Sequence, residues 1–187
     1  VGVQCGLGYT STVTVAGSRV ENLFPTVVGQ EARYGRGILT FCDSAAGILN
    51  DTVTLGTKRS VTWGPAFGHL AILSGARVFV TNTTATSRLT VGEAGRGLLT
   101  LDGGACHAYR FYATNRTDSV IDFTRGRLAI HTGVISNQTG LTVGDGGGAA
   151  TLEHWGGGRT DIFGNLTFAP QSDWQIDADA AATSVLD

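Results

Sequence analysis

The sequence of 187 residues has no methionine, three prolines, three cysteines and only 15% charged residues. Cys5, Cys42 and Cys106 form neither a Cys-x-x-Cys pair nor a metal-ligand spacing, so we expect no metal site and no cofactor. The net charge of -2 and the scattered basic residues lack the basic patch of a nucleic-acid binder. No apolar run approaches the roughly 20 residues that cross a bilayer as a helix, so no membrane-spanning segment is expected.

Glycine is abundant, with 28 residues, and a short apolar phrase that begins with glycine recurs along the chain. The phrase reads glycine, any residue, Leu or Ala, Thr or Ala, apolar, at 37–41, 68–72, 97–101, 126–130 and 148–152. The steps between these glycines are 31, 29, 29 and 22 residues, a spacing typical of solenoids. With no run of strong helix formers, the phrases predict an all-β solenoid, a parallel β-helix of about five to six coils with three short strands each.

Each phrase is predicted to be the second strand of its coil. Alternation along a strand then points two residues of each phrase inward as core columns: Leu39 and Phe41, Leu70 and Ile72, Leu99 and Leu101, Leu128 and Ile130, and Ala150 and Leu152. First strands are expected around 27–29, 54–56, 90–92 and 142–144. Corner loops at 58–67 and 107–119 are expected to absorb the uneven spacing.

Two ends of different character flank the repeats. Residues 1–25 lack the full pattern and are predicted to be a cap or an assembly segment, 26–176 form the solenoid, and 177–187 are a polar tail. A solenoid exposes an open strand edge at each end, and that edge must be capped or paired with another chain. We therefore expect self-association through the solenoid ends, with 1–15 and 166–176 as the contacting segments.

Five of the six asparagines belong to an Asn-x-Thr sequon: Asn50, Asn82, Asn115, Asn137 and Asn165. In the register above, the first four fall in the corner between the third strand of one coil and the first strand of the next. A sixth phrase, 164–168, is read as a first strand matching 141–143, because Asn165 then joins the same corner. N-glycosylation at all five sites is the preferred interpretation, and it implies a secreted or cell-surface protein. An asparagine ladder that hydrogen-bonds along the stack is the alternative.

Few residues are candidates for catalysis, ligand binding or a disulfide. In the expected register Asp102, His131 and Glu153 lie outward on consecutive coils, where they form either an acid-base centre or a surface charge ladder. Tyr109 and Tyr112 are candidates for stacking on a sugar ring, although the same aromatic residues also fit a third strand and its packing. A disulfide between Cys5 and Cys42 would attach the N-terminal segment to the first full coil.

The segments Leu89–Gly104 and Leu141–Gly148 resemble the β-strand repeats of autotransporter passenger domains and related large bacterial surface proteins. The resemblance covers about two thirds of the chain. It implies a right-handed β-helix displayed outside the cell, with adhesive or structural roles common and enzymatic roles in a minority. The dense sequons are not characteristic of those bacterial repeats.

Together these observations favour a non-enzymatic, secreted, N-glycosylated structural or adhesive β-solenoid, a subunit of an extracellular filament or surface assembly with surface glycans as a further partner. Two alternatives stay open. One is a polysaccharide-active β-helix enzyme, a lyase or hydrolase, which would need clustered acids on one sheet. The other is a carbohydrate-binding module that uses the region of Tyr109 and Tyr112.

Overall fold

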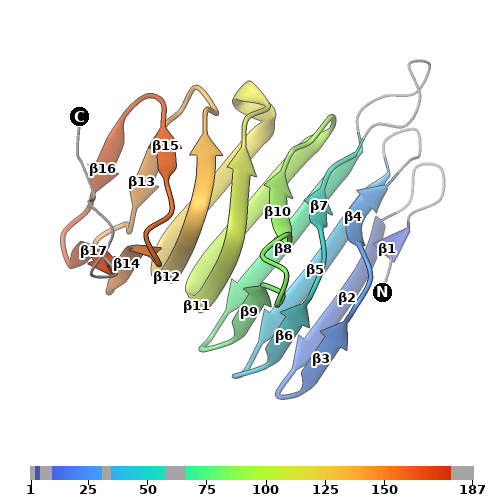
Figure 1. Ribbon diagram of the computed structural model, residues 1–187. Helices are drawn as coiled ribbons and strands as arrows, with labels where there is room; N and C mark the ends of the chain where they lie inside the picture. Colours follow the sequence, from blue (N-terminus) through green and yellow to red (C-terminus); the bar gives the residue numbers. More distant parts are fainter. Residues whose placement is uncertain (1–2, 5–9, 31–34, 58–65, 178–187) are drawn as a thin grey trace.

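The computed structural model describes residues 3–4, 10–30, 35–57 and 66–177. It confirms the predicted fold class: 64% of the residues are in strands, 2% are in helix, and parallel coils stack into a β-solenoid of about six turns. Figure 1 shows the strands as a row that begins with β1, β2 and β3 near the N-terminus and ends with β15, β16 and β17 near the C-terminus.

Each turn has three faces, and the strands on each face stack in parallel. The first face holds β1 (Val3–Gln4), β4 (Thr26–Gln30), β7 (Val53–Leu55), β10 (Arg88–Val91), residues 110–113 of β11 (Arg96–Ala113), residues 132–135 of β12 (Ser119–Ile135) and β15 (Thr160–Ile162). The second face holds β2 (Thr10–Ala16), β5 (Arg36–Cys42), β8 (Phe67–Leu73), residues 96–103 of β11, residues 119–123 of β12, β13 (Leu141–Val143) and β16 (Leu166–Phe168). The third face holds β3 (Arg19–Asn22), β6 (Ala46–Leu49), β9 (Arg77–Val80), residues 104–108 of β11, residues 126–130 of β12, β14 (Ala150–Trp155) and β17 (Ser172–Asp177).

The core consists of continuous columns of inward side chains. On the second face Leu39, Leu70 and Leu99 occupy the same register position and are almost completely buried, as the sequence predicts. Fully burying one such side chain stabilises the fold by about 1.5 to 3 kcal/mol. Since every coil repeats the same inward positions, the core runs along the whole stack.

The corner between the first and second faces explains why the phrase begins with glycine. Gly56 has a φ of +69°, which favours glycine, and a Cβ atom on Gly68 of the same coil would lie 2.3 Å from the Gly56 nitrogen. The backbone therefore approaches itself too closely for any side chain. This requirement accounts for Gly37, Gly68 and Gly97, which are register partners at this corner.

The predicted register is wrong after residue 101. The phrase at 126–130 lies beside 104–108 on the third face, with Leu128 next to Cys106, and on its other side Leu128 pairs with Leu152. The true neighbour of the phrase at 97–101 on the second face is 119–123, where Ser119 pairs with Gly97 only 22 residues earlier. Leu128, Ile130, Ala150 and Leu152 are buried as expected, but on the third face.

The corrected register also affects the predictions for residues 107–119 and 166–168. Residues 107–113 belong to β11 and not to a corner loop, which leaves only 114–118, with the single-turn η1 (Arg116–Asp118), at that corner. The predicted match of 166–168 with 141–143 is confirmed, since Leu141 pairs with Leu166. Both segments lie on the second face, however, because Gly144 donates a backbone hydrogen bond to Phe123.

The coil pattern begins earlier than residue 26. Within the segment assigned to a cap, β2 pairs with β5 over seven residues and β3 pairs with β6 over four. The segment 10–22 is therefore stacked like the coils that follow it. Most of the predicted polar tail, 178–187, lies outside the described residues.

Candidate functional site

The predicted column of Asp102, His131 and Glu153 is not formed. Asp102 is adjacent to Arg125 and pairs with its guanidinium at 2.5 Å, while Glu153 pairs with Arg127 on the third face. His131 is positioned against Tyr109 and Trp155 instead. The two carboxylates are thus held in separate ion pairs, and the acid-base arrangement expected from the sequence depended on the incorrect register.

Aromatic side chains form a column on the outer surface where the third face meets the first. The ring of His131 lies 4.4 Å from that of Tyr109 and 5.0 Å from that of Trp155, and its Nδ1 is 2.9 Å from the Trp155 carbonyl oxygen. A neighbouring pair, Phe79 and His107, is stacked at 4.9 Å. These rings contact one another along the stack, so the column stabilises adjacent coils.

The two tyrosines predicted to bind sugar do not share a surface. Tyr109 belongs to the aromatic column, whereas Tyr112 lies on the first face, where the Arg88 guanidinium sits 5.9 Å from its ring. The alternative interpretation, that these aromatic residues form a strand and its packing, agrees with their place in β11. Trp155 was missed by the sequence analysis, because its place in the column follows from the corrected register.

The sequons occupy two corners and not one. Asn50 and Asn82 lie between the third and first faces, whereas Asn115, Asn137 and Asn165 lie between the first and second. Asn82 donates a hydrogen bond to the Asn50 backbone carbonyl, a partial asparagine ladder. Asn165 is exposed, but Asn137 is only 1% exposed and neither polar atom of its amide has a hydrogen-bond partner. A glycan has no room on Asn137 in this fold, and glycosylation at the other four sites stays a prediction.

The cysteines differ in environment. Cys42 is partly buried and its thiol is 3.5 Å from an Asp43 carboxylate oxygen. Cys106 is completely buried, and burial raises the pKa of its thiol to about 12, which keeps it protonated and unreactive. Cys5 lies outside the described residues, so the predicted pair with Cys42 stays a prediction.

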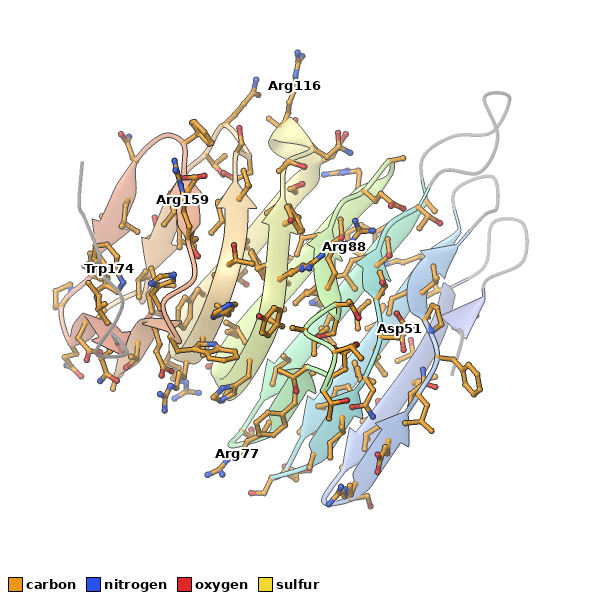
Figure 2. All side chains as sticks on the ribbon, in the orientation of Figure 1. Asp51, Arg77, Arg88, Arg116, Arg159 and Trp174 are labelled. Atoms are coloured by element: carbon orange, nitrogen blue, oxygen red, sulfur yellow. The ribbon has the colours of Figure 1, made fainter. Side chains whose placement is uncertain are left out.

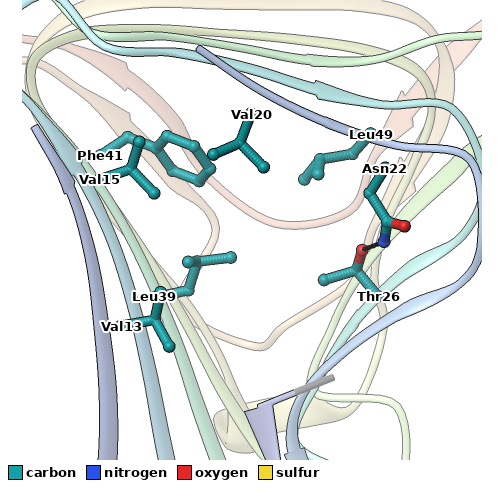
Figure 3. Close-up of a pocket in the computed structure, with 8 residues that line it drawn as sticks. All are labelled: Val13, Val15, Val20, Asn22, Thr26, Leu39, Phe41 and Leu49. Atoms are coloured by element: carbon teal, nitrogen blue, oxygen red, sulfur yellow. Dashed lines mark hydrogen bonds between the residues drawn. The ribbon is translucent and has the colours of Figure 1, made fainter. Parts of the chain in front are cut away.

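An apolar hollow opens at the N-terminal end of the solenoid (Figure 3), and we call it the N-terminal mouth. Its volume is about 380 Å³, including the space open to solvent, and it is lined by Val13, Val15, Val20, Asn22, Thr26, Leu39, Phe41 and Leu49. The amide of Asn22 donates a hydrogen bond of 2.7 Å to Thr26. Val13 and Val20 are only half-buried, because β2 and β3 have strand partners on one side alone among the described strands.

The opposite end presents a second apolar surface, the C-terminal face, which consists of inward side chains of the last coil: Ile162, Leu166, Phe168, Trp174 and Ile176. Phe168 is 37% and Ile176 is 41% exposed. Figure 2 shows Trp174 at this end of the stack. These residues continue the core columns of the preceding coils but have no further coil above them in the described part of the chain.

Other kinds of site are not found among the residues that the structure describes. No group of three or more His, Cys, Asp or Glu side chains is placed to hold a metal ion. None of the described helical residues forms a helix long and apolar enough to cross a membrane. The geometry thus defines a β-solenoid whose most distinctive surfaces are its two ends. The chain matches no protein-family model, no curated protein and no solved structure.

Proposed function

We propose that this protein is a secreted, N-glycosylated, non-enzymatic β-solenoid that serves as a structural or adhesive element and assembles end to end. The resemblance of its repeats to autotransporter passenger domains supports display outside the cell. Its sequons support passage through a secretory pathway, with glycans at Asn50, Asn82, Asn115 and Asn165 along two edges of the rod.

One observation carries the assembly part of the proposal. Among the described residues, six large apolar side chains are exposed, and five of them lie on the first or last coil: Leu23, Phe24, Phe163, Phe168 and Ile176. The sixth, Val120, lies on the side of the rod. Exposed apolar patches of this kind mark interaction surfaces.

The strand edges favour the same arrangement. Among the described strands, β2 and β3 at one end and β16 and β17 at the other have a partner on one side only. A strand edge that has no neighbour among the described strands can take a further strand by hydrogen bonding. Because the two ends are different surfaces, a contact between them is heterologous, and its repetition produces a filament.

The test compares two substitutions at side chains of similar exposure. Phe168→Glu places a carboxylate at the C-terminal face, and Val120→Glu places one on the side of the rod. The native residues are similarly exposed, Phe168 to 37% and Val120 to 40%. Burying a charge in an apolar contact costs several kcal/mol, so Phe168→Glu should weaken association at least about 100-fold while Val120→Glu leaves it unchanged.

Association is measured by analytical ultracentrifugation and by the length of rods in electron micrographs, with thermal unfolding as the check that each variant is folded. Intact mass before and after glycosidase treatment tests the glycans on the same sample. Native protein that stays monomeric at all concentrations, or equal loss of assembly in both variants, would contradict the assembly proposal.

A further inference from the structure

The columns of the solenoid define how two copies fit together. Resting on the end-to-end assembly proposed above, we propose that the C-terminal coil of one copy stacks on the N-terminal coil of a second copy in the same register that neighbouring coils use within one molecule. In this joint β16 lies on β2 and β17 lies on β3. The partner is thus a second copy of this chain.

Two inward columns of the second face are apolar from end to end. One column starts at Val13 and passes through Leu39, Leu70, Leu99, Ile121 and Leu141 to Leu166. The next starts at Val15 and ends at Phe168 through Phe41, Ile72, Leu101, Phe123 and Val143. Stacking copies in this register places Leu166 on Val13 and Phe168 on Val15, so both columns continue across the joint without a polar residue.

The third face adds the largest side chain of the C-terminal face. The column of Trp174 contains Leu152, Leu128, Cys106 and Val78, and it reaches Val20 through Gly47. Trp174 of one copy would therefore lie against Val20 at the rim of the N-terminal mouth of the next. The mouth is open and apolar there, which suits an indole ring.

The outward column beside it carries opposite charges at its two ends. It begins at Arg19, continues through Ala46, Arg77, Ala105, Arg127 and Thr151, and ends at Asp173. Neighbouring strands are about 4.8 Å apart, so in the joint Asp173 of one copy lies next to Arg19 of the other. A contact between two like ends would not place Arg19 next to Asp173, so this charge pair favours the joint between unlike ends.

Both charged groups are available for such a pair. Arg19 lies 3.6 Å from Glu21, and about two thirds of its side chain is exposed. Asp173 accepts hydrogen bonds from Thr151 and Gln175, which lower the pKa of its carboxyl, and it is exposed at the last strand. Each group can add its partner from the second copy without giving up a buried contact.

The test is a charge reversal across the joint. Arg19→Asp alone and Asp173→Arg alone should each weaken assembly on the order of tenfold, because like charges then meet in every joint. A 1:1 mixture of the two variants should assemble like the native protein, since both kinds of joint in an alternating rod regain opposite charges. The double variant should assemble by itself for the same reason.

The matched control is Arg77→Asp, which reverses a charge of the same outward column in the middle of the rod, where Figure 2 shows Arg77 pointing away from the stack. It should leave assembly unchanged. Sedimentation and rod length are the measurements, and circular dichroism checks folding. Assembly of the native protein that resists both single reversals, or a mixture that does not recover, would overturn this register while leaving end-to-end assembly intact. A native protein that never assembles would overturn both proposals.

Discussion

Two half-buried histidines lie on outward columns of different faces, and the surroundings of each disfavour its charged form. His69 on β8 lies 3.0 Å from the Thr100 hydroxyl, and His107 on β11 stacks on Phe79. Burial lowers the pKa of both imidazoles from 6.5, and nearby arginines lower it further: Arg36 beside His69, and Arg127 and Arg77 beside His107, where Glu153 partly opposes them. The folded protein therefore disfavours protonation of both imidazoles.

The expected consequence is a loss of stability on mild acidification. Near and below pH 6.5 the unfolded chain binds more protons at His69 and His107 than the folded protein does, so the free energy of unfolding should fall as the pH is lowered from 7 to 5. Denaturant unfolding at each pH measures this. A His69→Gln and His107→Gln double variant should show a shallower pH dependence over that range, and an identical slope would contradict the assignment. Asp173 has a lowered pKa, so its contribution to stability is present above its usual pKa of 3.8 and is lost only as the pH falls below that value.

Single residues also show where sequence reasoning succeeded and where it failed. Gly37, Gly68 and Gly97 were predicted to be equivalent, and they are register partners at a corner where a Cβ atom on any of the three would clash with backbone atoms. Ser119 takes the same place on the next coil, buried to 1% exposure, with its hydroxyl donating to the Val91 carbonyl at 2.6 Å. A repeat pattern that requires glycine at this position therefore misses Ser119.

At the level of strands, an apolar residue at every second position does not identify the face of the solenoid. Leu128 and Ile130 satisfy the pattern on the third face as well as they would on the second, because both faces point their inward residues into one core. The step of 29 residues from Gly97 to Gly126 matched the preceding coil by coincidence, since the coil itself takes only 22. Strand content and parallel stacking were therefore predictable, whereas the register of the coils after residue 101, and with it their outward columns, was not.

Cross-linking between strands tests the corrected register directly. Thr100 is the neighbour of Asp122 on the second face, whereas the phrase-based register would place it beside Ala129, which is on the third face beside His107. Neighbouring strands about 4.8 Å apart fall within the Cα separation of a disulfide. Thr100→Cys with Asp122→Cys should cross-link on oxidation, and Thr100→Cys with Ala129→Cys should not. Mass spectrometry of a non-reduced digest identifies the linked peptides, and the reverse result would restore the phrase-based register.

For the whole molecule, each coil contacts chiefly the coils next to it, so resistance to opening should depend on position along the stack. The middle strand β11 pairs with strands on both sides, whereas β17 has one partner among the described strands. In monomeric protein we expect amide hydrogen exchange in β11 to be roughly tenfold slower than in β17. Hydrogen-exchange mass spectrometry measures the gradient, and uniform protection would contradict it.

The step between Gly97 and Ser119 has a consequence for how such a chain can grow. Those 22 residues complete one circuit of three faces and end in register with their own start. An in-frame duplication of 66 base pairs spanning this stretch would add one full coil and about 4.8 Å of length without altering the coils on either side. The geometry therefore makes length one of the easiest properties of this protein for evolution to change, since a gene lineage can lengthen or shorten the rod by whole units while both ends keep their sequence.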